Sequence, residues 1–408
     1  MIKIPEGYKK DKNRIIPQDW DFVKIDTILE KIGKRVNVEK EELYQQIGIR
    51  SHGKGLFHKE LVTGRELGNK SVFWVEKDCF IVNIVFAWEQ AIGRTTEKEV
   101  GMICSHRFPM YRPKESRVDI DYLVYLFKTP YGKKVLELAS PGGAGRNKTL
   151  GQKEFMNSEI LIPNLIEEQK KIVEILSTWD VAIEKQDQLI EKKKEFKKGL
   201  MQRLLSGEVR FKEFKDKWLK SPINKIAKIG IGKTPDRKNN NYWGTGYKWL
   251  SIGDMRSKNI LNTKEEITQL AIEECNMKIV PKGTLVMSFK LTLGKVAILD
   301  DDMYTNEAIC NFDVNREVIN KNYLYYYLDF IDVSKFGSRA TKGITLNQET
   351  LSGIIIKYPC LEEQNKIAET LISVDKEIEL LEKELEALKL QKKGLMQRLL
   401  TGEVRVKV

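Results

Sequence analysis

The sequence predicts an α+β protein with an internal twofold repeat, in which two mixed α and β blocks are joined by two long antiparallel coiled-coil helices. Three observations lead to this prediction. The stretch KKGLMQRLLSGEVR at Lys197 returns as KKGLMQRLLTGEVR at Lys392, 195 residues later. Apolar residues around both copies recur with the 3.5-residue period of a coiled coil. Short runs rich in Val, Ile and Phe, typical of strands, lie between these helical stretches.

The repeat extends beyond these fourteen residues and defines the architecture. IPNLIEEQKKI at Ile162 corresponds to YPCLEEQNKI at Tyr358, and WDFVKI at Trp20 corresponds to WLKSPI at Trp218. The expected segments are a first block at 1–162, a first arm at 163–207, a second block at 208–358 and a second arm at 359–408.

Each arm carries a predicted seam of apolar residues that alternate steps of three and four. Pro163 and Pro359 stand just ahead of the two helices, and Gly207 and Gly402 are expected to end them. Two unrelated amphipathic helices, each packed on its own block, are the alternative. The predicted seam residues are Ile172, Leu176, Trp179, Ile183, Ile190, Leu200 and Leu204 in the first arm, with Gln186, Lys193 and Lys197 as polar interruptions, and Ile367, Leu371, Val374, Ile378, Leu381, Leu385 and Leu388 in the second.

Connectivity predicts that the paired arms are antiparallel. The second block follows the end of the first arm and precedes the start of the second, so a compact block brings these two ends close together. Gly199 and Gly394 interrupt the arm patterns, where glycine costs about 1 kcal/mol relative to alanine. Two roles remain open for them: they allow a close helix approach, or they mark an early helix end.

Within the blocks, strands are expected at SVFWV from Ser71, CFIVNIVFAW from Cys79, GTLVMSF from Gly283 and KVAILD from Lys295. Helices are expected at DIDYLVYLFKT from Asp119 and NKNYLYYYLDF from Asn320, because their apolar residues have helical spacing. Each block is therefore expected to be a mixed α and β domain.

Composition favours a polyanionic partner. Seventy Lys and Arg against 58 Asp and Glu give a net charge of +12, and nucleic acid is such a partner, although charge alone does not decide it. The five cysteines are an odd number without a C-x-x-C pair, so neither a zinc site nor a disulfide framework is indicated. No signal peptide or membrane-length apolar run is present, and a soluble cytoplasmic protein is expected.

Motifs for catalysis are missing. GIGKT at Gly230 imitates a phosphate loop, but Ala227 occupies the position of the first glycine and Pro235 with turn-forming residues follows in place of a helix. No N/D-P-P-aromatic methyltransferase motif and no P-D…D/E-x-K nuclease pattern occurs. His52, His58 and His106 lack metal-ligand spacing, so we expect no catalytic residue and no metal site.

Several basic, turn-rich loops are suited to nucleic acid. Lys and Arg in these loops would contact phosphates, and the side-chain amide of Asn can form two hydrogen bonds with one adenine base. Each loop taken singly is also compatible with a solvated turn. Because such loops occur in both blocks, a role in nucleic-acid binding is favoured. The candidate DNA-binding residues are Lys233, Thr234, Arg237, Lys238, Asn239, Asn240, Asn241, Tyr242, Lys290, Arg339 and Lys342 in the second block, and Arg50, His52, Lys54, Arg146 and Lys148 in the first.

The chain contains PNLIEEQ at Pro163, PCLEEQ at Pro359, the repeated KKGLMQRLL ends, GKTPDRKNNNYWG followed by KWLSIGDM, and TNEAICNF at Thr305. In these motifs, and over nearly its whole length, it resembles the specificity subunit of a Type I restriction-modification enzyme. IVNIVFAWEQAIG at Ile81 matches the family pattern less closely. In that family, two target-recognition domains held apart by two antiparallel helices each read one half of a bipartite DNA site.

The resemblance implies partners and cofactors. Two copies of a methylating subunit that binds S-adenosylmethionine would dock on the helices, and motor-nuclease subunits would bring ATP and magnesium. This chain would itself be non-catalytic, bind double-stranded DNA and hold no cofactor. A DNA-binding regulator that acts alone, or a coiled-coil scaffold that binds no DNA, are the competing classes.

Overall fold

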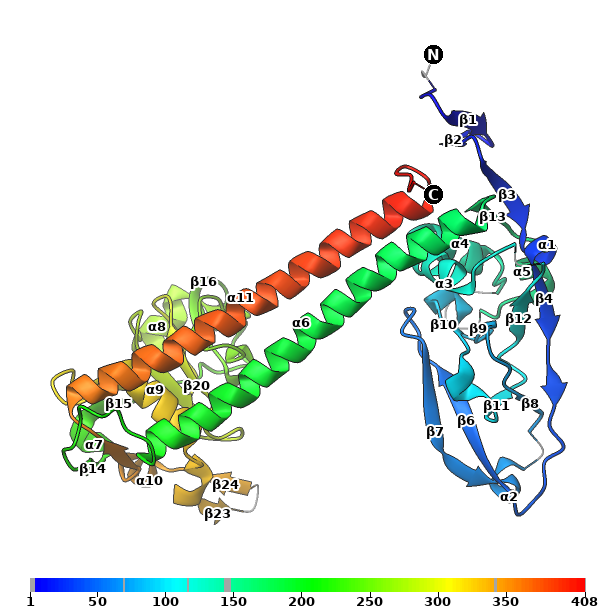
Figure 1. The fold of residues 1–408 in the computed structure, drawn as a ribbon. Helices are drawn as coiled ribbons and strands as arrows, with labels where there is room; N and C mark the ends of the chain where they lie inside the picture. Colours follow the sequence, from blue (N-terminus) through cyan, green and yellow to red (C-terminus); the bar gives the residue numbers. More distant parts are fainter. Residues whose placement is uncertain (1–3, 69, 116, 143–147, 341–342, 408) are drawn as a thin grey trace. The chain divides into compact units, whose positions relative to one another are not determined.

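The computed structural model describes residues 4–68, 70–115, 117–142, 148–340 and 343–407 (Figure 1). The chain forms two compact units. Unit 1 contains Met1–Asp187 and Lys383–Val408, and unit 2 contains Gln188–Glu382. Each unit therefore holds one block together with part of both arms.

Both arms are single long helices, α6 (Ile166–Ser206) and α11 (Leu361–Leu400). They end as predicted at Gly207 and Gly402, which have φ values of +78° and +74°. Such left-handed conformations are easily reached by glycine, so these two residues terminate the helices without strain.

The arms are antiparallel, as predicted. In unit 1, Asp180 of α6 forms an ion pair with Lys392 of α11, and Gln186 donates to Glu384 at 3.0 Å. A higher number on α6 therefore meets a lower number on α11. The same order holds in unit 2, where Lys193 pairs with Glu377 and Lys197 pairs with Asp375.

The described seam residues face inward. Those of both arms are buried or half-buried, and they include Ile172, Leu176, Ile190, Leu204, Ile367, Leu371, Val374, Ile378 and Leu385 among the buried ones, with Trp179, Ile183, Leu200, Leu381 and Leu388 half-buried. The three polar interruptions also have partners: Gln186, Lys193 and Lys197 each meet an acidic side chain of α11. Polar seam positions of this kind fix the register of a helix pair.

Gly199 and Gly394 play neither role expected from the sequence within this chain. Both helices continue past them, so an early helix end is wrong. A Cβ atom built at either glycine meets nothing within 4 Å, so neither allows a close approach inside the described chain. Both glycines are instead exposed on the arm surface.

The first block occupies most of unit 1 and mixes short strands with helices. Its elements are β1 (Tyr8–Asp11), β2 (Arg14–Pro17), β3 (Trp20–Lys24), α1 (Ile25–Ile28), β4 (Leu29–Ile32), β5 (Lys34–Arg35), β6 (Leu43–Ile49), β7 (Leu56–Thr63), α2 (Gly64–Leu67), β8 (Val72–Trp74), β9 (Phe80–Val82), η1 (Ala87–Glu89), β10 (Ile92–Arg94), η2 (Glu97–Glu99), β11 (Ile103–Ser105), β12 (Met110–Pro113), α3 (Ile120–Lys128), α4 (Pro130–Leu138), α5 (Gln152–Asn157) and β13 (Glu159–Pro163).

The second block occupies most of unit 2. Its elements are β14 (Leu219–Pro222), α7 (Ile223–Ile226), β15 (Ala227–Ile231), η3 (Asn240–Tyr242), β16 (Trp243–Leu250), η4 (Ile252–Asp254), β17 (Asn259–Ile260), β18 (Glu265–Ile267), α8 (Gln269–Glu274), β19 (Leu285–Ser288), β20 (Val296–Leu299), β21 (Tyr304–Thr305), β22 (Ile309–Val314), α9 (Lys321–Phe330), η5 (Val333–Phe336), β23 (Ser338–Ala340), β24 (Gly343–Thr345), α10 (Gln348–Ser352) and β25 (Ile355–Tyr358).

Each block contains its own copy of one type of sheet. Its strand order is β10-β9-β12-β4 in the first block and β20-β19-β22-β15 in the second, where β17 is added at one edge. All three pairings are antiparallel in both blocks. We call this the common sheet. A two-stranded ribbon, β3 with β13 or β14 with β25, connects each block to the start of its arm.

Each block also has a second sheet, and here the blocks differ. The first block carries five strands in the order β5-β8-β11-β6-β7, and the second carries three in the order β18-β16-β21. We call these the variable sheets. Both are supported by small apolar clusters separate from the main core, so they can differ without altering the common sheet.

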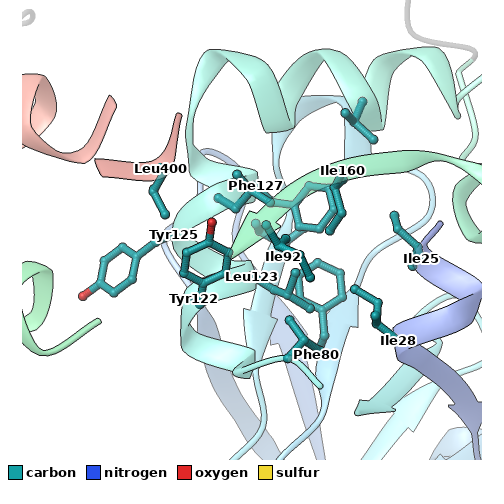
Figure 2. Packing of buried hydrophobic residues seen from close by; sticks show 14 of the residues in the cluster. Ile25, Ile28, Phe80, Ile92, Tyr122, Leu123, Tyr125, Phe127, Ile160 and Leu400 are labelled. Atoms are coloured by element: carbon teal, nitrogen blue, oxygen red, sulfur yellow. The ribbon is translucent and has the colours of Figure 1, made fainter. Parts of the chain in front are cut away.

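The main core of unit 1 joins the block to both arms. Phe80, Leu123 and Phe127 pack between the common sheet and α3, and Leu400 at the end of α11 contributes to the same cluster (Figure 2). The corresponding core of unit 2 contains Tyr323 and Leu324 of α9 together with residues of both arms. The arm ends are therefore part of each block's core.

Most predicted elements of the blocks are present, with one difference. The helices expected from Asp119 and Asn320 are α3 and α9, and three of the four expected strands form as β8, β19 and β20. The run from Cys79 forms a strand only to Val82. The Asn83 side chain then accepts from the N–H of Val85 at 3.1 Å, which turns the chain into the short helix η1.

Candidate nucleic-acid interface

The loop between β15 and β16, Lys233–Tyr242, holds its arginine firmly. Arg237 donates two hydrogen bonds to Glu265, at 2.6 and 3.0 Å. Its guanidinium lies 3.8 Å from the ring centre of Trp243 and 4.8 Å from that of Trp249. The hydrogen bonds from Arg237 lower the pKa of Glu265. Arg237 therefore shapes the loop, although half of its side chain is exposed.

Other predicted residues of this loop also have partners inside the block. Lys233 donates to two backbone carbonyls at 3.2 Å, and Thr234 donates to Glu307. The Asn239 side chain accepts from the N–H of Asn241, and the Tyr242 hydroxyl donates to Glu274 at 2.6 Å, which raises the pKa of Tyr242. A turn and the single-turn helix η3 follow Pro235, and this geometry does not provide the helix that a phosphate loop requires.

Three side chains of the loop remain available. Lys238, Asn240 and Asn241 are exposed, and their side chains have no hydrogen-bond or ion-pair partner in the part of the chain that the structure describes. A cation next to two free amides is suited to contact a phosphate and the edge of a base. The loop thus combines residues held by partners inside the block with three exposed side chains, Lys238, Asn240 and Asn241, that are available to DNA.

In the first block, the predicted residues Arg50, His52 and Lys54 lie in the turn between β6 and β7 of the variable sheet. Arg50 donates to the carbonyl of Leu56 at 3.0 Å and stacks on Phe57. His52 is exposed with a φ of +61°, and Lys54 is exposed with no side-chain partner among the described residues. This turn again combines a held arginine with a free lysine.

The remaining predicted residues are less informative. Lys148 lies over the ring of Trp88, and Lys290 lies over that of Phe289. Arg339 belongs to the short strand β23. Arg146 and Lys342 lie outside the described residues.

Sequence reasoning missed the roles of the repeated EEQ and GEVR motifs, which meet across the arms. In unit 2, Arg210 donates to both oxygens of Glu363 at 2.9 and 2.6 Å, and the Glu363 side chain is fully buried. Each GEVR arginine thus binds the glutamate at the start of the other arm. We call this contact the clasp.

In unit 1, the clasp pairs Arg405 with Glu168, at 2.7 and 3.0 Å. Trp20 donates a further hydrogen bond to Glu168 at 3.2 Å, and Asp19 accepts from Arg405 at 2.7 Å. The hydrogen bond from Arg405 lowers the pKa of Asp19, and the bond to Glu168 raises the pKa of Arg405. The polar residues of both motifs are repeated in the sequence, and this repetition was the signal that could have indicated the clasp.

The glutamine of each EEQ motif joins an arm to its block. Gln169 is fully buried, accepts from the N–H of Asp119 at 2.9 Å, and donates to the carbonyls of Arg117 and Pro163. Gln364 makes the equivalent three bonds, to the N–H of Asn320 and to the carbonyls of Val318 and Pro359. The carbonyls of Pro163 and Pro359 would otherwise be buried without these partners, and the other four backbone groups are part-buried.

The repeat matches one protein family twice. The family model of the Type I restriction modification DNA specificity domain matches residues 17–192 and again residues 215–390. The chain belongs to this family. Each match covers a block and most of the following arm, so one specificity domain includes the common sheet, the variable sheet and a helix.

Individual relatives agree. The putative Type I restriction enzyme MjaX specificity subunit of Methanocaldococcus jannaschii is 26% identical, with 98% of this chain and 97% of the relative covered. A chain from a solved structure on complex assembly and conformational transition of the Type I R-M system has a TM-score of 0.65 at 15% identity, covering 95% of this chain and 99% of that one. The HsdS subunit of Thermoanaerobacter tengcongensis has a TM-score of 0.55 at 16% identity, covering 96% and 99%. The structural likeness supports the two-domain, two-helix fold.

Two further observations concern the described residues. None of the described helices combines the length and apolar character needed to cross a membrane. Among those same residues, no group of three His, Cys, Asp or Glu side chains is placed to hold a metal ion.

Proposed function

We propose that this chain is the DNA-reading subunit of a Type I restriction-modification enzyme, in which each block reads one half of a bipartite site in double-stranded DNA. The observation that carries this proposal is the twofold match to the specificity domain, combined with two variable sheets on one common sheet. A shared scaffold with different reading surfaces suits a protein that reads two different half-sites. The chain recognises DNA, and catalysis belongs to its partners.

The contacts with DNA divide into two kinds. Lys54 and Lys238 are free cations in the two blocks and would neutralise phosphates, which supplies affinity but no sequence information. Asn240 and Asn241 are free amides beside Lys238 and would read adenine edges in the major groove. Arg237 would hold this loop in shape rather than contact DNA through its paired groups.

The arms would dock two copies of the methylating subunit. Their exposed faces repeat Lys198, Gly199 and Gln202 as Lys393, Gly394 and Gln397, so two equivalent surfaces are offered. The open space above the glycines would admit the backbone of a partner. S-adenosylmethionine would be bound by this partner, ATP and magnesium by motor-nuclease subunits, and the assembly would work in the cytoplasm.

A block exchange tests the reading function. Replacing Trp218–Lys357 with the corresponding block of a relative, in the complex with the methylating subunit, should change one half of the methylated site and leave the other half intact. If both halves changed, or neither, the blocks would not be independent readers.

The chain alone, given DNA, ATP, magnesium and S-adenosylmethionine, should neither cleave nor methylate.

A bulky residue tests docking. Gly199→Leu places a side chain in open space, so the chain should fold normally while binding of one of two methylating subunits weakens. The matched variant Gly394→Leu should weaken the other. Two copies still bound with wild-type affinity would place the docking surface elsewhere.

The arms would also set the spacer between the half-sites. Helices of 41 and 40 residues rise about 1.5 Å per residue and so extend about 60 Å. Inserting four residues near Leu380 and four near Lys185 adds about 6 Å, which should lengthen the unread spacer by one or two base pairs at about 3.4 Å each. An unchanged spacer in a variant that still methylates would show that the arms do not determine it.

A further inference from the structure

Helix α3 of the first block is attached to the first arm, α6, at two polar points. The first is Gln169, which accepts from the N–H of Asp119 at the start of α3. The second lies six residues later on α3, where the hydroxyl of Tyr125 donates to Asp180 of α6 at 2.6 Å. Asp180 is eleven residues beyond Gln169, about 16 Å along the helix. The apolar core holds α3 against Ile172 and Leu176 of α6, and two separated polar points add a directional constraint that apolar packing lacks.

The second point also includes the other arm. Asp180 forms an ion pair with Lys392 of α11, and the Lys392 ammonium lies 5.2 Å from the ring centre of Tyr125. Only 15% of the Lys392 side chain is exposed. The block, the first arm and the second arm therefore meet in three side chains, Tyr125, Asp180 and Lys392, which we call the first latch.

Unit 2 repeats the arrangement at equivalent positions. Tyr326 is six residues beyond Asn320, and its hydroxyl donates to Asp375 at 2.5 Å. Asp375 is eleven residues beyond Gln364 and pairs with Lys197 at 2.6 Å. The second latch has one more member, Lys258, which donates to Tyr326 at 2.6 Å and to Asp375 at 3.2 Å.

The latch residues are repeated, whereas only some of the neighbouring residues are. Val124 and Lys128 of α3, on either side of Tyr125, correspond to Tyr325 and Asp329 of α9. Hydrogen-bonded ion pairs of this kind add little net stability but demand a particular geometry. Figure 2 shows the ring of Tyr125 at the edge of the packed cluster, with its hydroxyl directed away from the other labelled side chains. Its hydroxyl therefore serves orientation more than packing.

We propose that the two latches are positioning sites that fix the direction in which each block is held by the arms, and that this direction determines which spacer length between the half-sites is accepted. The inference rests on the DNA-reading function proposed above. On B-DNA with about 3.4 Å per base pair, a tilt of about 10° displaces a loop about 20 Å from the pivot by one base-pair step. Small tilts therefore matter for the spacer.

The two latches differ in redundancy, which gives a built-in comparison. Without the Tyr125 hydroxyl, α3 loses its hydrogen bond to Asp180. Without the Tyr326 hydroxyl, Lys258 of the second block still reaches Asp375. Tyr125→Phe should therefore loosen its block more than Tyr326→Phe, and adding Lys258→Met to the latter should remove the difference.

The first experiment measures methylation by the complex of full chain and methylating subunit on DNA whose spacer is correct or one base pair longer or shorter. Tyr125→Phe should raise the methylation of shifted sites relative to the correct site about fivefold, as expected for losing part of a hydrogen bond to a charged group. The control is Tyr122→Phe on the same helix, since the Tyr122 hydroxyl is buried without a partner in the described structure. It should leave the ratio unchanged.

The second experiment needs no DNA and keeps the two proposals separable. Spin labels at Lys98→Cys in the block and Thr178→Cys in α6, with Cys275 and Cys360 changed to Ser, report the distance between block and arm. Tyr125→Phe should broaden the distance distribution, and Tyr122→Phe should not. An unchanged distribution, or an unchanged spacer ratio in a complex whose wild type discriminates, overturns the latch. A wild-type complex that ignores the spacer, with a broadened distribution in the variant, overturns the reading function and its spacer role but keeps the positioning.

Discussion

The two blocks differ in their variable sheets, the proposed reading surfaces, and agree where the arms hold them. Their common sheets have the same strand order and direction, while one variable sheet has five strands and the other has three. The free lysines and amides of the candidate interface lie on or beside the variable sheets. The buried glutamines, the clasps and the latches lie where block and arm meet, and they are repeated. Repetition within one chain thus separates the residues that hold a block from those proposed to read DNA.

The clasps show a finer difference. Glu168 keeps a hydrogen bond from Trp20 in addition to its arginine, whereas the indole N–H of Trp218, the residue equivalent to Trp20, is buried without a partner among the described residues. Asp19 supports Arg405 in unit 1, and Lys217 stands at that position in unit 2. Unit 1 therefore has the more redundant clasp. Substitutions at the repeated contacts test whether these contacts are equivalent in energy as well as in geometry.

The largest effect is expected from the buried glutamines. Gln169→Ala and Gln364→Ala each remove three hydrogen bonds and leave one buried and two part-buried backbone groups without this partner. Each change should lower the free energy of unfolding by about 3 kcal/mol. Chemical denaturation of the full chain measures this, with the exposed Gln202→Ala as a control that should change little. A loss in only one of the two variants would show that the arm starts are not energetically equivalent.

The clasps should rank next and in a defined order. Arg210→Ala leaves the fully buried Glu363 without its ion-pair partner and should cost about 2 kcal/mol, whereas Arg405→Ala leaves Glu168 with the Trp20 N–H and should cost about 1 kcal/mol. The same denaturation measurement decides. If Arg405→Ala proved the more harmful, the contribution of Trp20 would be negligible and that of Asp19 dominant.

The candidate interface predicts a smaller, salt-dependent effect. Lys54→Ala and Lys238→Ala should each weaken DNA binding and reduce the slope of log affinity against log salt by roughly one unit. Fluorescence anisotropy across a salt series measures it. Lys192→Ala, at an exposed position on the first arm, serves as the control. A slope that is unchanged in both block variants would place these loops away from DNA.

Acidification tests the second latch. Burial opposes ionisation of Asp375, but hydrogen bonds from Lys197 and Tyr326 and the charge of Lys258 lower its pKa, while the nearby Asp329 has a pKa raised by burial. A lowered folded-state pKa adds stability above the unfolded value of about 3.9 and loses it as the pH falls through the folded value. The difference in melting temperature between wild type and Asp375→Asn should therefore shrink below about pH 4. A constant difference from pH 7 to pH 3 would contradict this ion pairing.

The arms were predictable because their signals are local. A heptad pattern, a preceding proline and a terminal glycine lie within one continuous stretch, and the antiparallel pairing follows from connectivity. The helices α3 and α9 were predictable for the same reason. The strand expected from Cys79 failed beyond Val82, because a single asparagine side chain there turns the backbone.

The site was less predictable because its contacts are distant in sequence. From the sequence, Arg237 was predicted to contact phosphates. In the structure its guanidinium donates to Glu265, which lies 28 residues away in the sequence. The clasp of unit 1 joins residues 237 positions apart. The repeated motifs marked these glutamates, glutamines and arginines as important, but a pattern in one dimension does not show which copy meets which.

The clasps also impose an order on biosynthesis. Unit 2 is one continuous segment, and its clasp spans 153 positions and is complete once Glu363 has been made. Unit 1 is assembled from two segments, and its first block must wait for Arg405 and the buried Leu399 and Leu400. Because contacts between distant residues form slowly, the block made first is finished last. A nascent chain thus leaves exposed the part of the first block's core that Leu399 and Leu400 cover until translation reaches the final residues, and this apolar surface is then open to aggregation.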